Sequence, residues 1–184
     1  MKHKLFFQIA LTFSFICLQP LFSIARNQDF ESGMQLLEAK DYKAAMLKFE
    51  NVIKSMESNK DFGSDYEIAL NNLALCYNLN FQYVRAEVTY RKLISMIKRR
   101  KGVPDGVAEG GLAKALLNQK KFAQAEIFYK SAVSIFDRRF GADHPIVRQY
   151  LVDLETCLRS SNRTKEADEI ESRIKQIPKI PGLN

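Results

Sequence analysis

Four short segments of the chain repeat one pattern about forty residues apart. Each segment closes on an alanine, and these alanines are Ala45, Ala86, Ala125 and Ala167. They stand 41, 39 and 42 residues apart along the 184-residue chain. Self-similarity with a fixed period of this size is typical of stacked repeats, in which each unit buries its apolar face against its neighbours. Such arrays usually offer a binding surface rather than a catalytic pocket.

Each repeat predicts two helices. Large side chains follow the alanine after four and seven residues, as Tyr90 and Leu93 follow Ala86, and these spacings share one helical face. A second helix is predicted before the alanine, over residues 69–77, 111–117 and 150–158 of the later repeats. Because the alanine has a small side chain, two antiparallel helices can approach closely there. The sequence therefore predicts an all-α chain of helix pairs.

The pattern resembles the tetratricopeptide repeat, which has a small residue in the first helix, an aromatic residue or Leu three positions later, and then the alanine. The pairs at these positions are Gly33 and Leu36, Ala74 and Tyr77, Ala113 and Leu116, and, with a poorer fit, Glu155 and Leu158. Residues 70–75 and the turn at 139–147 resemble the kinesin-light-chain type of this repeat.

The resemblance covers residues 28–176 and implies a right-handed α-solenoid of about four antiparallel helix pairs. We expect the repeat domain to span residues 26–177, with units at about 28–58, 64–101, 104–140 and 143–177. Four units exceed the roughly three that a stable stack needs. Because Pro178 and Pro181 interrupt any helix, residues 178–184 are expected to form an irregular tail.

The first 25 residues have the pattern of a secretory signal peptide. A short basic segment, residues 1–4, precedes an uncharged stretch over residues 5–25. Ser23 and Ala25 place small residues where a signal peptidase reads them. The sequence therefore predicts an exported protein, located in the periplasm, the envelope or the extracellular space, whose mature chain starts at Arg26.

The same segment is compatible with two alternatives to cleavage before Arg26. An uncleaved anchor is long enough, since 21 uncharged residues can cross a bilayer. Pro20 would break such a helix near its end, however, and a break there suits the presentation of a cleavage site. Lipidation at Cys17 is disfavoured because Ile16 is bulky where that processing prefers a small residue.

Basic residues cluster at the ends of two predicted second helices, in residues 98–101 and at Arg138 and Arg139. The helix dipole favours cations at helix carboxyl ends, which explains these clusters without any ligand. The alternative explanation is that the clusters bind an anionic partner along one edge of the stack. Removing residues 1–25 lowers the formal net charge from +7 to +5. Export disfavours nucleic acid as the partner.

The mature chain would retain two cysteines, Cys76 and Cys157, at matching places in repeats two units apart. Adjacent helices pack about 8–10 Å apart, whereas a disulfide requires Cα atoms within about 7 Å. We therefore expect two buried, free thiols.

No residue pattern indicates an enzyme, a metal site or a cofactor. His144, the single histidine outside the signal, lies in an Asp-His-Pro turn and is expected to be a turn residue. Gly110 and Gly111 are a lone pair inside a repeat, where small residues help packing, rather than a phosphate loop. One histidine and two separated cysteines do not supply a metal site.

The remaining candidate is a peptide-binding groove. In tetratricopeptide arrays the first helices line a concave surface, and the resemblance places eleven residues on it: Phe30, Met34, Asn71, Asn72, Leu75, Asn78, Lys114, Leu117, Val152, Thr156 and Arg159. An asparagine amide both donates and accepts, so it can pair with a peptide backbone. The alternative is that these asparagines are simply hydrated.

The sequence thus predicts a non-enzymatic protein-interaction module that binds a peptide segment in this groove. Apolar side chains beside Lys114 and Arg159 favour a peptide with an apolar part and an acidic group. The alternative function is an accessory subunit of an envelope complex, which docks through outer or end-repeat surfaces.

Overall fold

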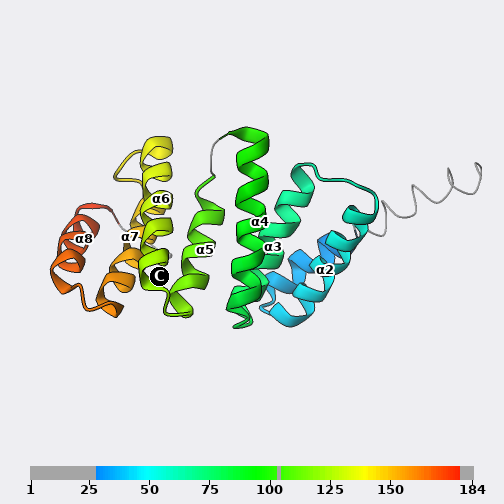
Figure 1. Ribbon diagram of the computed structural model, residues 1–184, viewed down its shortest axis with the longest axis horizontal. Coiled ribbons are helices and arrows are strands. Elements are labelled where there is room, and N and C mark those ends of the chain that lie inside the picture. The colour runs from blue at the N-terminus through cyan, green and yellow to red at the C-terminus, as the bar shows by residue number, and fades with distance from the viewer. Residues whose placement is uncertain (1–27, 103–104, 179–184) are drawn as a thin grey trace, which may run out of the picture. The chain divides into compact units, whose positions relative to one another are not determined.

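The computed structural model describes residues 28–102 and 105–178, and Figure 1 shows that this part of the chain is helical. The predicted signal peptide and residues 179–184 of the predicted tail lie outside it. A first helix covers residues 28–38. The following helices are α2 (Tyr42–Ser58), α3 (Ser64–Leu79), α4 (Tyr83–Lys101), α5 (Val107–Asn118), α6 (Phe122–Phe140), α7 (Pro145–Ser160) and α8 (Thr164–Gln176). The predicted all-α class is confirmed.

The turn inside each helix pair has one geometry that recurs four times. A residue with positive φ follows the first helix of every pair, at Lys40 (62°), Phe81 (59°), Lys120 (60°) and Asn162 (60°). The next residue donates its backbone N–H back across the turn, as Gln82 does to the Tyr77 carbonyl at 2.8 Å and Lys121 does to the Leu116 carbonyl at 2.9 Å. Such reversals satisfy the last helical carbonyls, and they fix the start of the second helix.

The described residues divide into two compact units, one up to Ala69 and one from Leu70. In the first unit, helix 28–38 packs on α2, where a Cβ atom at Gly33 would stand 3.0 Å from Cζ of Phe49. Ala45 and Phe49 are fully buried. Asp41 accepts from the Ala44 amide at 3.0 Å and caps α2, which explains why the helix begins at Tyr42.

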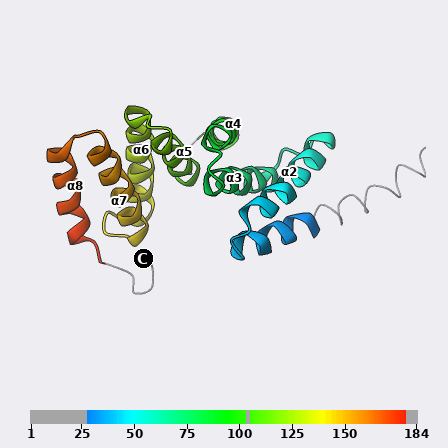
Figure 2. The same ribbon diagram turned by 90° about the horizontal axis from the view of Figure 1, so that it is seen from below.

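In the second unit each helix from α4 to α8 contacts the next one along the chain, and α4, α5 and α6 stand side by side in Figure 1. Ala86, Ala125 and Ala167 are fully buried, as the close approach of helices at these positions requires. Figure 2 shows the same succession from below. The predicted pairing of consecutive antiparallel helices is therefore confirmed.

Two neighbouring glycines of α5 admit two tyrosines. A Cβ atom at Gly110 would stand 2.0 Å from Cε1 of Tyr150, and one at Gly111 would stand 2.3 Å from Cζ of Tyr90. The rings of α7 and α4 thus lie directly on the α5 backbone. The expectation that this glycine pair serves packing is confirmed.

The predictions for the thiols and for the histidine are also confirmed. Cys76 and Cys157 are free and buried. His144 precedes α7 and accepts the Ile146 amide on Nδ1 at 3.2 Å, which makes it the N-cap of that helix. None of the described helices combines the length and the apolar character of a membrane-spanning segment.

Candidate functional site

The predicted groove residues of the second unit come from three first helices: α3, α5 and α7. Four of them, Asn71, Leu75, Leu117 and Val152, are partly exposed, and Lys114, Thr156 and Arg159 are exposed. Asn72 and Asn78 are buried, at 9% and 8% exposure. We call the partly or fully exposed members from Asn71 to Thr156 the first-helix face.

Asn78 is used inside the fold. Its Nδ2 donates to the Gly111 carbonyl at 2.9 Å and so joins α3 to α5. It also lies beside the hydroxyl of Tyr90. The pKa of Tyr90 is raised, mainly by burial, and the contact with Asn78 offsets part of this rise. A side chain held in this way positions two helices and does not face a ligand.

Lys114 of the first-helix face forms an ion pair with Asp153, a residue outside the predicted groove set. Lys114 Nζ of α5 stands 3.2 Å from Asp153 Oδ1 of α7, and the two side chains are 49% and 21% exposed. Asp153 lies near the buried Tyr129, whose pKa is raised first by burial and then by this carboxylate. The ion pair therefore ties α5 to α7 and leaves Lys114 within reach of solvent.

Arg159 is engaged by three carboxylates. Its guanidinium stands 2.6 Å from Glu155 on α7 and 3.1 Å and 2.9 Å from Asp168 and Glu171 on α8. The hydrogen bond with Glu155 is the main reason that the pKa of Arg159 is raised. Arg159 thus fastens α7 to α8, and its charge is balanced within the chain.

The other predicted members give the face a mixed character. Leu75, Leu117 and Val152 each keep part of their apolar surface exposed. Thr156 donates its hydroxyl to the Val152 carbonyl at 2.9 Å, which leaves its methyl group for contact. Apolar patches beside a polar pair suit a bound chain with alternating side chains.

Phe30 and Met34 belong to the first unit. Both are partly exposed. The Phe30 ring packs edge-on against Phe49, with ring centroids 5.8 Å apart, so Phe30 contributes to the packing of helix 28–38 on α2.

Sequence reasoning missed an apolar surface on the second helices. Val84 and Val88 of α4 and Ile127 of α6 are 65%, 64% and 65% exposed. Val88 and Ile127 each stand two residues after a repeat alanine, and in the first unit Leu47 does the same at 53% exposure. This regularity is visible in the sequence, because an aliphatic residue recurs two positions after the repeat alanine.

Among the residues that the structure describes, no three or more His, Cys, Asp or Glu side chains are grouped so that they could hold a metal ion. The basic runs end α4 and α6, as predicted, with Arg138 and Arg139 in the last turn of α6.

The comparisons with known proteins agree with this fold. Residues 104–174 match the family model of the tetratricopeptide repeat. The chain is similar to the crystal structure of BtubC (BKLC) from P. vanneervenii, with a TM-score of 0.75 at 16% identity over 86% of this chain and 67% of that one. It is also similar to the TPR-like repeats of a Podosopora anserina protein described as a kinesin light chain, with a TM-score of 0.69 at 17% identity over 80% and 72% of the two chains. No curated protein matches it.

Residues 104–174 are therefore similar to the tetratricopeptide repeat, and the fold is similar to that of kinesin-light-chain-like repeat structures over most of the chain. Repeats of this kind generally act as scaffolds for protein–protein interaction and are typically not enzymes.

Proposed function

We propose that the chain is a non-enzymatic scaffold that binds an extended peptide segment of a partner protein on the first-helix face. The observation that carries the proposal is the combination of a solvent-accessible ion pair, Lys114 with Asp153, and exposed apolar surface on the first-helix face. That apolar surface belongs to Leu75, Leu117 and Val152, which are partly exposed. Apolar contacts would supply affinity. Asn71, which is partly exposed on α3, would pair with the peptide backbone.

An acidic group in the peptide would compete with Asp153 for Lys114. Both predicted cations of the groove are already paired in the chain, Lys114 with one carboxylate and Arg159 with three. Lys114 is the more available of the two because only one bond has to be exchanged. The proposed ligand is therefore an extended peptide with apolar side chains and one acidic side chain positioned at Lys114.

A library of random peptides displayed on phage tests this function with the full chain as bait. Peptides that bind would be synthesised, and their affinities measured for the wild type, Asn71→Ala and Lys114→Ala. The control is the Arg99→Ala/Arg100→Ala pair at the end of α4, which removes two charges outside the first-helix face. We expect both single variants to weaken binding and the control to leave it unchanged. Loss of binding in the control alone would contradict the proposal.

A second candidate function, docking as an accessory subunit through an outer surface, is favoured by the exposed Val84, Val88 and Ile127. The double variant Val88→Glu/Ile127→Glu separates the two. Under the docking function it would remove the chain from its native complex while the selected peptides still bind.

We further propose that the protein is exported, on the strength of the uncharged residues 5–25 and of the small residues Ser23 and Ala25. Amino-terminal sequencing of the native protein tests this. A start at Arg26 is expected, and an intact Met1 would contradict cleavage.

A further inference from the structure

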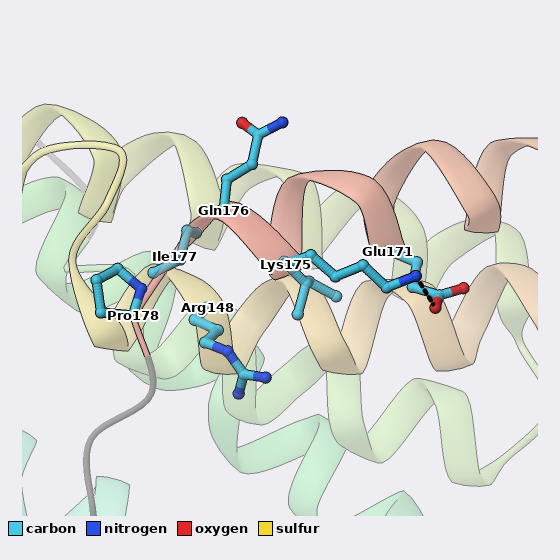
Figure 3. Close-up of a pocket in the computed structure, with 7 residues that line it drawn as sticks. Arg148, Glu171, Lys175, Gln176, Ile177 and Pro178 are labelled. Atoms are coloured by element: carbon cyan, nitrogen blue, oxygen red, sulfur yellow. Dashed lines mark ion pairs between the residues drawn. The ribbon is translucent and has the colours of Figure 1, made fainter.

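A pocket of about 500 Å³ lies between α7, α8 and the residues that follow α8. This volume is within the range of small-ligand sites in proteins, about 300–1,000 Å³. Figure 3 shows its lining: Lys175 and Glu171 on α8, Arg148 on α7, and the segment of Ile177 and Pro178 beyond α8. None of the predicted groove residues is among them.

Arg148 is the unusual member of this lining. Its Nε atom is buried and has no hydrogen-bond partner, and within the described residues the side chain has no ion pair either. Buried polar groups of folded proteins are nearly always paired, because an unpaired donor loses its hydration without compensation. Arg148 also lies at the start of α7, where no acidic residue stands in the first turn and where the helix dipole disfavours a cation.

The acidic side chain of the pocket is already occupied. Glu171 Oε1 stands 2.7 Å from Lys175 Nζ, and Glu171 Oε2 accepts from Arg159 at 2.9 Å. The dashed line in Figure 3 joins Lys175 to Glu171 and leaves Arg148 apart. Both oxygens of the carboxylate are thus engaged with other cations, and Arg148 is left as the unsatisfied donor.

The charge and the walls of the pocket indicate the class of ligand. Two cations and one carboxylate give the lining a single net positive charge, which suits a monoanion better than a phosphate dianion. A guanidinium matches a carboxylate with two parallel hydrogen bonds. Ile174 and Ile177 are buried members of the adjoining core, and together with Pro178 they present an apolar wall.

We propose that the α7–α8 pocket binds a peptide carboxylate through Arg148, with a neighbouring apolar side chain against Ile174, Ile177 and Pro178. The carboxylate is supplied either by a free carboxyl terminus or by an acidic side chain of the partner. This site is separate from the first-helix face and does not depend on peptide binding there.

Nuclear magnetic resonance titration of the full chain tests the proposal, with the Arg148 Nε–H and the backbone amides of Ile174 and Ile177 as reporters. Four probes are compared. One is an N-acetylated leucine tripeptide with a free carboxyl terminus, and another is the same tripeptide as its amide. The third is an amidated peptide in which a glutamate replaces the central leucine, and the fourth is phenyl phosphate.

Saturable shifts of these reporters by the acid, with binding roughly 10- to 100-fold weaker for the neutral amide, are expected for a charge-assisted pair. The glutamate probe identifies the source of the carboxylate. Binding as tight as that of the acid indicates an acidic side chain, and weaker binding indicates a carboxyl terminus. Equal affinities of the acid and the neutral amide would overturn the proposal, as would the absence of shifts at millimolar concentrations. Tighter binding of phenyl phosphate than of the acid would overturn the ligand class.

Variants locate the effect. Arg148→Gln should lower affinity for the acid by roughly 10- to 100-fold. Arg148→Lys keeps the positive charge but cannot make two parallel hydrogen bonds to a carboxylate, so it should have an intermediate effect. Arg99→Gln removes the same charge from α4 and is the matched control. If both Arg148 variants bind the acid as tightly as the wild type, the assignment is wrong, whatever the affinity of the control.

Discussion

Tyr150 of α7 lies on the backbone of Gly110 in α5 so closely that a Cβ atom at Gly110 would stand 2.0 Å from its Cε1 atom. The same ring stacks on Phe136 of α6, with centroids 5.0 Å apart. One tyrosine thus connects three consecutive helices of the second unit. The contact depends on the absence of a side chain at Gly110.

Gly110→Ala should therefore destabilise the protein. Alanine is the better helix former by about 1 kcal/mol, but the clash with Tyr150 forces a rearrangement that costs about 1–3 kcal/mol. Urea denaturation should show a net loss of stability. Gly63→Ala is the control, since the nearest atom to its Cβ would be Asp61 Oδ1 at 3.7 Å. A Gly110→Ala protein more stable than the wild type would contradict the observed packing.

Ala86→Leu and Ala125→Leu should each lower stability by about 1–3 kcal/mol, because both alanines are fully buried where helices approach. Thermal melts measure the loss. Ala123→Leu changes an exposed alanine of α6 in the same way and should have a small effect. Unchanged melting temperatures for Ala86→Leu and Ala125→Leu would be inconsistent with the observed repeat register.

The thiol of Cys76 should be almost inert in the folded protein. Burial raises its pKa to about 11 from 9.0, so at pH 8 the reactive thiolate is about 100-fold scarcer than in an unfolded chain. Because the raised pKa favours the neutral thiol, this contribution to stability is present below pH 9 and is lost as the pH rises through 11. Alkylation of the mature chain, residues 26–184, with and without urea, followed by intact mass, should show two modified thiols only after unfolding. Rapid modification of the native protein would contradict the burial.

Glu87 should stabilise the junction of α4, α5 and α6 in a pH-dependent way. Burial alone would raise its pKa, but hydrogen bonds from Lys121, Arg91 and Gln119 outweigh burial and lower it. A lowered pKa gives stability that is present above the ordinary glutamate value of about 4.3 and lost as the pH falls through the folded value. Glu87→Gln should cost about 1 kcal/mol at pH 7.

The cost of Glu87→Gln should shrink in acid, where the wild-type carboxyl is protonated as well. Urea denaturation at neutral and acidic pH measures both values. A cost that is the same at the two pH values would mean that the charge of Glu87 contributes nothing.

Lys114→Ala and Asp153→Asn should change peptide affinity in opposite directions. Removing Lys114 removes the proposed contact for an acidic side chain, whereas removing the Asp153 charge frees Lys114 from its partner at 3.2 Å. Affinities of the selected peptides and of versions with the acidic residue neutralised measure this. If Asp153→Asn weakens binding of the acidic peptide as much as Lys114→Ala, the ion pair serves the fold and does not select the ligand.

Much of the fold could be predicted because packing at a repeat imposes the same demand at every period. A residue at which two helices cross must be small, as Ala86 and Ala125 are, and the sequence shows this requirement directly. The turns were not predicted in detail. Phe81 and Lys120 adopt positive φ without being glycine, and the hydrogen bonds that reverse the chain there outweigh the local backbone preference.

The candidate site was predictable only as far as position on a helix determines exposure. Leu75 and Lys114 could be assigned to the exposed side of their helices from the repeat register. Gly111, the partner of Asn78, and Glu171, one of the partners of Arg159, come from neighbouring helices, 33 and 12 residues away. Sequence spacing does not reveal such long-range hydrogen bonds.

The sequence by itself determined the helices, their pairing and the buried alanines, because these follow from local periodicity and side-chain volume. The tertiary structure decided which polar side chains remain available to a partner. Asn78 and Arg159 hold helices together through their side-chain contacts. Arg148, by contrast, has a buried Nε donor without an acceptor, and no sequence pattern singled it out. The physical reason is that hydrogen bonds and charges are satisfied across helices, at distances that only the folded chain sets.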